Sequence, residues 1–182
     1  MPFLPTGIAG LYVIEPRVFE DDRGYFFESY NSQNFEKEGL DYHFVQDNES
    51  RSSKNVLRGM HYQLPPMAQA KLVRATTGAV LDVVCDIRPD SDTYGKTFQI
   101  ELSAENKKQL LIPRGFAHGF LVLTDIAVFN YKCDNYYSKE HDRGLHAFDE
   151  NLGIDWGITQ DQATFSEKDS AQPGFGDHST YQ

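Results

Sequence analysis

Short runs in which apolar and polar residues alternate follow one another along most of this 182-residue chain. The runs are rich in Val, Ile, Phe and Tyr, and Gly, Pro, Asp and Asn separate them, which is typical of strands joined by turns. In AVLDVVCDIR, residues 79–88, Leu81 and Cys85 share one face of the predicted strand while Asp82 and Asp86 share the other. The spacing predicts an all-β sandwich or barrel. Its expected strands lie within residues 10–16, 25–30, 43–48, 55–63, 70–78, 79–88, 97–103, 108–113, 118–124 and 127–133.

Helical signals are few. The segment NSQNFEKEG has Asn31 or Ser32 as a candidate N-cap and Gly39 as a stop, and FSEKDS near Phe165 is expected to add a helical turn. A more polar, less regular region follows Tyr136, and the chain has no internal repeat or linker. We therefore expect a single domain over residues 1–182, with a mobile tail from about residue 172.

Composition and charge narrow the choice of function. With 40% hydrophobic and 24% charged residues, the chain can form a compact core. Its 27 acidic and 17 basic residues give a formal charge of -10, which disfavours binding of nucleic acid through the overall field but permits a local basic pocket. No stretch approaches the ~20 apolar residues that span a bilayer, and the N-terminus lacks a signal-peptide pattern. We expect a cytoplasmic protein, without a membrane or nucleic-acid partner.

The two cysteines, Cys85 and Cys133, each lie among apolar neighbours. Their number and spacing suggest neither a disulfide framework nor a zinc site. We expect both to be reduced residues that pack in the core.

Three polar side chains occupy predicted strands where the alternation alone does not require them. These are His61, His118 and Tyr131, and Lys71 lies near the first of them in sequence. Any one of them taken alone is better explained as a core side chain whose polar atoms find a partner. A β-barrel, however, directs inward positions from different strands into one cavity. The four residues together are therefore a candidate site.

Longer motifs identify a family. RGMHYQ, QAKLVRATTGAVLDVVCDIR, LSAENKKQLLIPRGFAHGF, YKC and FSEKD resemble, in order and spacing, the dTDP-4-dehydrorhamnose 3,5-epimerase family, and so do FEDDRGYFFESY and VQDNESRSS. The resemblance runs from about Leu11 to Asp169. It implies a cupin-type jelly-roll β-barrel or sandwich with a few short peripheral helices. It also implies a homodimer that works without a metal or an organic cofactor.

The resemblance also implies an activity and roles for individual residues. Members of the family convert dTDP-4-dehydro-6-deoxy-D-glucose into dTDP-4-dehydro-L-rhamnose, on the route to dTDP-L-rhamnose. By motif match, His61 is the base, Asp169 its carboxylate partner and Tyr131 the acid. Lys71 and His118 surround the sugar. Further substrate contacts match Arg23, Glu28, Gln46, Asn48, Arg58, Asp142 and Lys168.

These residue types suit the chemistry. C3 and C5 of such a sugar both neighbour the C4 ketone, so loss of either proton gives an enolate, and inversion needs reprotonation from the opposite face. A neutral histidine and a tyrosine hydroxyl on opposite sides supply that arrangement, and a lysine such as Lys71 can stabilise the enolate oxygen. Arg58 and Arg23 suit a diphosphate. Arg58 and His61 would face opposite ways in a regular strand, so we expect a bulge at Gly59.

Three alternatives stay open. A mono-epimerase acting at C3 or C5 alone could use the same residues, and a barrel that binds sugar nucleotides without catalysis could keep the same pocket. Many cupin-type barrels bind metal through two histidines two residues apart with a glutamate soon after. Here Gln63 stands two residues after His61 and LPPMAQA has no glutamate, so we expect no metal site.

The chain departs from the usual family pattern after the predicted barrel. Asp142 stands where glutamate is usual, and the segment GLHAFDENLGIDWGI differs from the family at Ala147, Phe148, Glu150 and Gly157. These differences leave the proposed acid and base in place, but they bear on which sugar nucleotide is bound.

Overall fold

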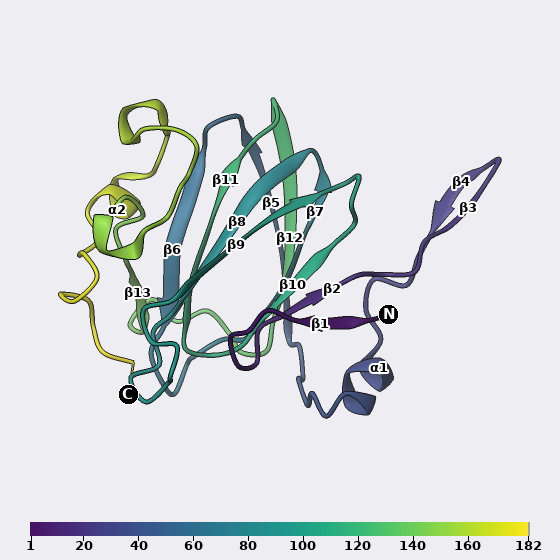
Figure 1. Ribbon diagram of the computed structural model, residues 1–182, viewed down its shortest axis with the longest axis horizontal. Helices are drawn as coiled ribbons and strands as arrows, with labels where there is room; N and C mark the ends of the chain where they lie inside the picture. Colours follow the sequence, from purple (N-terminus) through teal and green to yellow (C-terminus); the bar gives the residue numbers. More distant parts are fainter. Residues whose placement is uncertain (182) are drawn as a thin grey trace.

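Two antiparallel sheets face each other in the computed structural model, which describes residues 1–181 (Figure 1). The six-stranded sheet has the order β1-β2-β10-β7-β12-β5, and the five-stranded sheet has the order β13-β6-β11-β8-β9. The strands of the first sheet are β1 (Phe3–Pro5), β2 (Tyr12–Ile14), β10 (Gln109–Ile112), β7 (Lys71–Thr77), β12 (Ile126–Cys133) and β5 (Gln46–Ser53). Those of the second are β13 (Asp142–Gly144), β6 (Leu57–Gln63), β11 (Phe116–Val122), β8 (Ala79–Asp86) and β9 (Thr97–Ser103). This arrangement confirms the predicted all-β jelly-roll sandwich.

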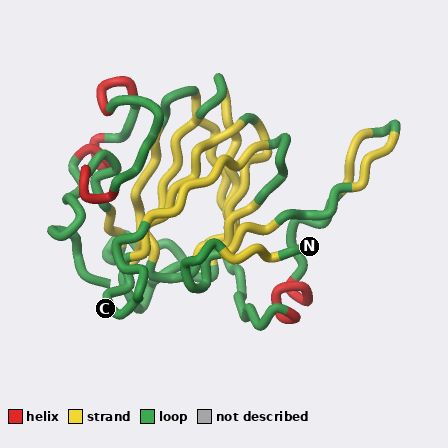
Figure 2. Tube along the Cα trace, in the orientation of Figure 1, coloured by secondary structure: helices red, strands yellow, loops and turns green. Residues whose placement is uncertain are grey.

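The remaining elements lie outside the sandwich, as Figure 2 shows with the helices in red and the projecting hairpin in yellow. They are the hairpin of β3 (Phe19–Asp21) and β4 (Gly24–Phe26), the helices α1 (Ser32–Lys37) and α2 (Glu167–Ser170), and the 3-10 turns η1 (Glu150–Leu152) and η2 (Gln160–Gln162). The β3–β4 hairpin projects away from the body (Figure 1), and α2 packs beside β6. Both predicted helical segments are confirmed, and Asn31 caps α1 by accepting a hydrogen bond from the backbone N–H of Gln33.

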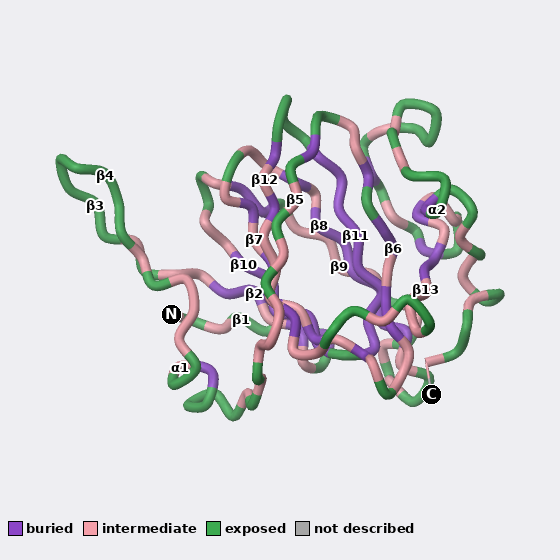
Figure 3. The backbone as a smooth tube through the Cα atoms, turned by 180° about the vertical axis from the view of Figure 1, so that it is seen from behind, coloured by how far each residue is buried: buried purple, intermediate pink, exposed green. Residues whose placement is uncertain are grey.

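Apolar side chains fill the space between the sheets and also pack against parts of both outer faces. Figure 3 shows the buried stretches of backbone along the central strands. The inner cluster includes Val73, Val84 and Phe129, each at most 1% exposed. A second cluster joins the outer face of the five-stranded sheet to the C-terminal segment, and a third joins the six-stranded sheet to α1 and the N-terminus. The core thus has three layers, and it holds the central strands rigidly around the site described below.

Strand β8 shows what this layering does to the sequence pattern. The alternation of Leu81 and Cys85 against Asp82 and Asp86 is present, but both faces are covered, and the two aspartates are fully buried. Asp86 accepts hydrogen bonds from Arg88. Asp82 contacts His118 through Oδ2. Polar residues on one face of a strand therefore do not mark a solvent face here, because both carboxylates find partners inside the protein.

Differences from the expected strands lie at the ends of the fold. Each predicted segment overlaps an observed strand, but β1, β3 and β13 were not predicted, and β5 continues to Ser53 rather than ending near Asn48. Strand β2, predicted from GLYVIEP, pairs on both sides within its own chain, with β1 and β10. The edges of the six-stranded sheet are therefore β1 and β5.

The segment expected to be a mobile tail lies against the barrel. Tyr62 donates a hydrogen bond to the carbonyl of Ser179 at 2.8 Å. Phe175 and Tyr181 pack on the cluster that covers the five-stranded sheet. Within residues 1–181, none of the helices is long and apolar enough to cross a membrane.

Candidate active site

A cavity of about 790 Å³ lies between the two sheets. Its walls come from β5, β7 and β12 on one side and from β6 and β11 on the other, and the segment that carries α2 completes it. Ten of the twelve site residues expected from the sequence line it, namely Gln46, Asn48, Arg58, His61, Lys71, His118, Tyr131, Asp142, Lys168 and Asp169. The fold therefore brings together residues that are up to 123 positions apart in sequence, from Gln46 to Asp169.

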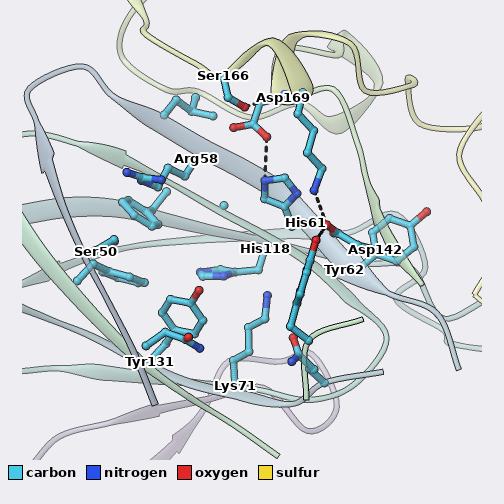
Figure 4. A pocket seen from close by; sticks show the side chains of 18 of the residues that line it. Ser50, Arg58, His61, Tyr62, Lys71, His118, Tyr131, Asp142, Ser166 and Asp169 are labelled. Carbon is cyan, nitrogen blue, oxygen red and sulfur yellow. Dashed lines mark hydrogen bonds and ion pairs between the residues drawn. The ribbon is translucent and has the colours of Figure 1, made fainter. Parts of the chain in front are cut away.

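His61 stands at the centre of this cavity with Asp169 directly beside it (Figure 4). Nε2 of His61 lies 2.8 Å from Oδ1 of Asp169, and the two side chains are 29% and 7% exposed. Nε2 carries the proton that faces the Asp169 carboxylate, so the lone pair of the neutral ring is on Nδ1. Within residues 1–181, Nδ1 has no hydrogen-bond partner. A buried acceptor without a partner calls for an explanation, and a base that takes a proton from a substrate is one.

The ionisation of Asp169 fits this role. Burial opposes ionisation, but hydrogen bonding with His61 and with the Ser166 hydroxyl outweighs it, so the pKa of Asp169 is below its ordinary value. The carboxylate is therefore charged at neutral pH. A fixed negative charge beside His61 stabilises the imidazolium that forms when the ring accepts a proton.

Gly59 explains how Arg58 and His61 both reach the cavity. Between β6 and β11, His118 pairs with His61 but Phe120 pairs with Arg58, so the register shifts at this point. Gly59 has φ +129°, and a Cβ atom there would lie 2.4 Å from the Cα of Gly119. The bulge predicted at Gly59 is confirmed, and only glycine fits the backbone there.

Tyr131 lines the wall opposite His61, because it lies on β12 of the six-stranded sheet whereas His61 lies on β6 of the other sheet. Burial raises the pKa of Tyr131, the nearby Cys133 adds to the rise, and Arg58 opposes it. The phenol therefore stays protonated at neutral pH and serves as a proton donor rather than a base.

Lys71 lies on β7, in the same wall as Tyr131, and His118 lies on β11, in the same wall as His61, and both side chains point into the cavity (Figure 4). Burial lowers the pKa of Lys71, and the neighbouring Cys133, Asp142 and Asp82 only partly oppose this. An anion formed beside the amine would favour its charged form again. Lys71 is therefore poised to stabilise a negative charge that appears during a reaction, such as that of an enolate oxygen.

Asp82 is a site residue that the sequence reasoning did not find. Its Oδ2 lies 2.9 Å from Nε2 of His118, and both side chains are almost completely buried, at 0% and 8% exposed. The pair fixes the orientation of the His118 ring behind the cavity wall. The clue in the sequence was a carboxylate in the middle of a largely apolar strand. The structure adds that Asp82 pairs with Phe120 on β11, two residues from His118.

Near the helix α2, Asp142 connects two other cavity residues. Lys168 forms an ion pair with Asp142, and the Tyr137 hydroxyl donates a hydrogen bond to the same carboxylate at 2.9 Å. Hydrogen bonding to Asp142 raises the pKa of Tyr137. Tyr137 is 58% exposed and lines the cavity, although the sequence reasoning did not single it out. It offers a flat aromatic surface at the edge of the cavity.

Neighbouring polar side chains hold three further residues of the cavity. Nε of Arg58 donates to Oγ of Ser52 at 3.1 Å, which leaves the remaining guanidinium N–H groups available. Gln46 donates to Asn48 at 3.0 Å. These groups give one cavity both hydrogen-bond donors and cationic charge, which suit a phosphorylated ligand.

Arg23 and Glu28 do not reach this cavity within the chain. Arg23 lies at the end of the projecting β3–β4 hairpin, where it pairs with Asp21. Glu28 accepts hydrogen bonds from Asn31 and Asn34 near α1. Their expected contact with substrate stays a prediction.

A cupin-type metal site would need a cluster of ligands. Within residues 1–181, no three His, Cys, Asp or Glu side chains are arranged to hold a metal ion. His61 and His118, the two histidines of the cavity, each contact a carboxylate through Nε2.

One family of known proteins matches most of the chain. The family model described as dTDP-4-dehydrorhamnose 3,5-epimerase matches residues 5–177. The chain is 57% identical over 157 residues to the dTDP-4-dehydrorhamnose 3,5-epimerase of Escherichia coli K12, covering 86% of this chain and 85% of that protein.

Two solved structures show the range of similar folds. The chain superposes with a TM-score of 0.93 and 43% identity on the dTDP-6-deoxy-D-glucose-3,5-epimerase of Legionella pneumophila in complex with dTDP-4-keto-L-rhamnose, covering 100% of this chain and 98% of that one. It superposes with a TM-score of 0.88 and 32% identity on ChmJ, a 3'-monoepimerase from Streptomyces bikiniensis in complex with dTDP-quinovose, covering 94% and 87%. The extent of the family match and the identity to these enzymes establish that the chain belongs to the dTDP-4-dehydrorhamnose 3,5-epimerase family.

Proposed function

We propose that this protein converts dTDP-4-dehydro-6-deoxy-D-glucose into dTDP-4-dehydro-L-rhamnose by inverting C3 and C5, in the synthesis of dTDP-L-rhamnose. The observation that carries the proposal is the placement of His61 and Tyr131 on facing sheets of one cavity, with Asp169 2.8 Å from His61. Inversion requires that a proton leave one face of the sugar and that another arrive at the opposite face. Two proton-transfer groups on opposite walls satisfy that requirement.

The reaction begins when His61 takes a proton from a carbon next to the C4 ketone. Asp169 stabilises the resulting imidazolium, and the electrons left behind form an enolate whose charge lies mostly on the C4 oxygen. Lys71 and His118 stabilise that oxygen, and Tyr131 then donates its proton to the carbon from the other side. His61 then releases its proton to water and Tyr131 takes a proton back from water, so that no net proton is consumed. With both groups restored, the same sequence at the second carbon completes the double inversion. These steps use the chain's own residues, and the proposed enzyme has no cofactor.

Binding of the nucleotide uses the rest of the cavity. Arg58 and Lys168 suit the diphosphate because cationic N–H donors pair strongly with phosphate oxygens. Tyr137 provides a face on which the nucleobase can stack, and Gln46 and Asn48 supply amide groups for its polar edge. Asp142, in contact with both Tyr137 and Lys168, holds these two side chains in place.

We propose a homodimer in which each subunit completes the other's site. The hairpin that carries Arg23 projects into solvent and exposes Phe26 and Tyr25, which are 70% and 58% exposed. Large exposed aromatic groups on a projecting element are typical of an interface. A two-fold axis would bring the hairpin of one subunit to the cavity of its partner. Arg23 and Glu28 would then contact the substrate bound by the partner.

A mixing experiment tests this arrangement. Arg23→Ala and His61→Ala are each expected to lose activity as pure dimers. If Arg23 serves the partner's cavity, a dimer of one Arg23→Ala subunit and one His61→Ala subunit has one complete site out of two. Random mixing of equal amounts makes about half of the dimers mixed, so about a quarter of the wild-type sites are restored. No recovery on mixing, or a monomer by light scattering, contradicts the proposal.

Measurements of turnover and of nucleotide binding together show whether the protein is an epimerase or a barrel that binds sugar nucleotides without catalysis. The purified protein is incubated with the 4-keto sugar nucleotide and the products are identified by NMR, while dTDP binding is measured by calorimetry. We expect wild-type protein to invert the sugar, and His61→Ala to bind dTDP but to lose turnover. A wild type that binds without inverting the sugar would be a binding protein. Stoichiometric metal by elemental analysis would favour the metal-dependent alternative.

A mono-epimerase is the second candidate, because the chain also superposes on a 3'-monoepimerase. It predicts inversion at one carbon only, which the same NMR spectra resolve. We further propose that residues 1–182 form one domain that works in the cytoplasm, where the free thiols of Cys85 and Cys133 stay reduced.

A further inference from the structure

We infer that Ser166 is a positioning residue for proton transfer, because it fixes the carboxylate of Asp169 that orients His61. This inference rests on the proposed function, and it adds a residue to which no role has been given above. Ser166 lies at the cavity edge next to Asp169 (Figure 4). Its proposed action is indirect, through Asp169, and requires no contact with the substrate.

The first argument is the hydrogen bonding around Ser166. The backbone N–H of Asp169 donates to Oγ of Ser166 at 3.1 Å and also approaches the carbonyl of Ser166 at 3.0 Å. The Ser166 hydroxyl also lowers the pKa of the Asp169 carboxyl. Ser166 therefore holds the backbone of the residue that contacts His61, and its hydroxyl favours the charged form of that residue's carboxyl.

The second argument is the shortness of α2. The helix spans only Glu167–Ser170, and Ser166 is its N-cap. A helix of one turn has too few internal hydrogen bonds to hold its own shape, because forming the first turn is unfavourable. The position of Asp169 therefore depends on the cap and on packing rather than on the helix itself.

The third argument is how the surrounding segment is attached. Before the helix, Thr164 exchanges backbone hydrogen bonds with Asn55 and Leu57 at 2.8 and 2.9 Å. After it, the N–H of His146 donates to the carbonyl of Pro173 at 2.8 Å. These bonds fix the two ends of the segment but not Asp169 in its middle.

Side-chain contacts complete the argument. Among the side chains of residues 1–181, those hydrogen-bonded or ion-paired to Asp169 are His61 and Ser166. His61 is the group to be oriented, so the backbone N–H of Gly59 and the side chain of Ser166 are left to orient Asp169. Of these two, only the Ser166 side chain can be removed by a substitution. Groups that hold a catalytic contact in this way commonly change activity by 10-fold to 100-fold, as partners of metal-binding histidines do.

The test compares two variants of the same shape. Ser166→Thr keeps a hydroxyl at the cap, and Ser166→Val has the same branched outline without it. We expect the threonine variant to keep kcat within about 3-fold of wild type, and the valine variant to lose about 10-fold or more in kcat with KM and dTDP binding unchanged. Ser103→Val removes a serine hydroxyl that accepts from a backbone N–H three residues on, that of Asn106 at 3.1 Å, outside the lining of the cavity, and is expected to keep kcat.

A double-mutant cycle shows whether Ser166 acts through Asp169. In an Asp169→Asn background, Ser166→Val is expected to cause little further loss of kcat, because the carboxylate that Ser166 holds is already gone. Additive losses would overturn the inference. So would a raised KM with unchanged kcat, which would make Ser166 a substrate contact, or equal kcat in the threonine and valine variants. A wild type without turnover would instead refute the proposed function.

Discussion

Replacing Asp169 with asparagine removes one charge from the centre of the site and changes little else. The amide has the same shape as the carboxylate and can still approach His61, whose Nε2 lies 2.8 Å from Oδ1 of Asp169. Asp169 is 7% exposed, so water does not replace the lost charge. The substitution therefore isolates the electrostatic support that Asp169 gives to the imidazolium.

The size of the effect follows from the geometry. Unit charges ~4 Å apart interact by about 4 kcal/mol at an effective dielectric constant of ~20. In the variant, a neutral hydrogen bond between the asparagine amide and His61 still contributes about 1 kcal/mol of that interaction energy. The net loss of about 3 kcal/mol corresponds to a fall in kcat of about 100-fold. KM is expected to change little, because the imidazolium forms only during the reaction.

The assay is steady-state turnover of the 4-keto sugar nucleotide, with thermal unfolding measured on the same samples. Asp161→Asn, a substitution of an exposed aspartate in η2, controls for the change of net charge. The control is expected to match wild type. If Asp169→Asn kept kcat within about 3-fold of wild type while remaining folded, then Asp169 would not support the base and the reasoning would be wrong.

Three further substitutions test other parts of the site and the core. Tyr131→Phe is expected to keep solvent exchange at the carbon from which His61 takes a proton but to lose inversion by about 10²-fold or more, which NMR of the product measures. Lys71→Met is expected to lower kcat by about 10²-fold without lowering Tm, because a buried amine is replaced by an apolar chain of similar length, and a lower Tm would contradict this. Burial opposes ionisation of Asp86, but hydrogen bonds from Arg88, Thr93 and Ser91 outweigh it and lower the pKa below 3.8. The charged carboxylate therefore stabilises the fold fully above pH 3.8, and this stabilisation is lost as the pH falls through the pKa of the folded state. Asp86→Asn should lower the free energy of unfolding by about 3 kcal/mol at pH 7 and by progressively less in acid.

The sequence was most informative where side chains alternate along strands. The predicted strands, both helical segments and the bulge at Gly59 are present in the structure, because periodicity, caps and turn residues act locally. The grouping of His61, His118, Tyr131 and Lys71 also followed from inward-facing strand positions.

Other features depend on contacts between distant parts of the chain. Asp82 could not be assigned to His118 from the pattern alone, since a carboxylate on a strand face is ordinarily exposed. The short strands β1, β3 and β13 carry too few residues for any periodicity. The position of Arg23 outside the cavity follows from the hairpin's course in space, which the motif match did not contain.

Incorporation of solvent deuterium into the sugar tests most directly whether His61 and Tyr131 transfer protons at both carbons. The purified enzyme is incubated with dTDP-4-dehydro-6-deoxy-D-glucose in heavy water, and NMR follows the hydrogens at C3 and C5. The arrangement of His61 and Tyr131 on opposite walls predicts that deuterium enters both positions and that both centres invert. Deuterium at one carbon alone would make the protein a mono-epimerase. Deuterium at neither carbon, with the nucleotide bound, would contradict proton transfer by this pair.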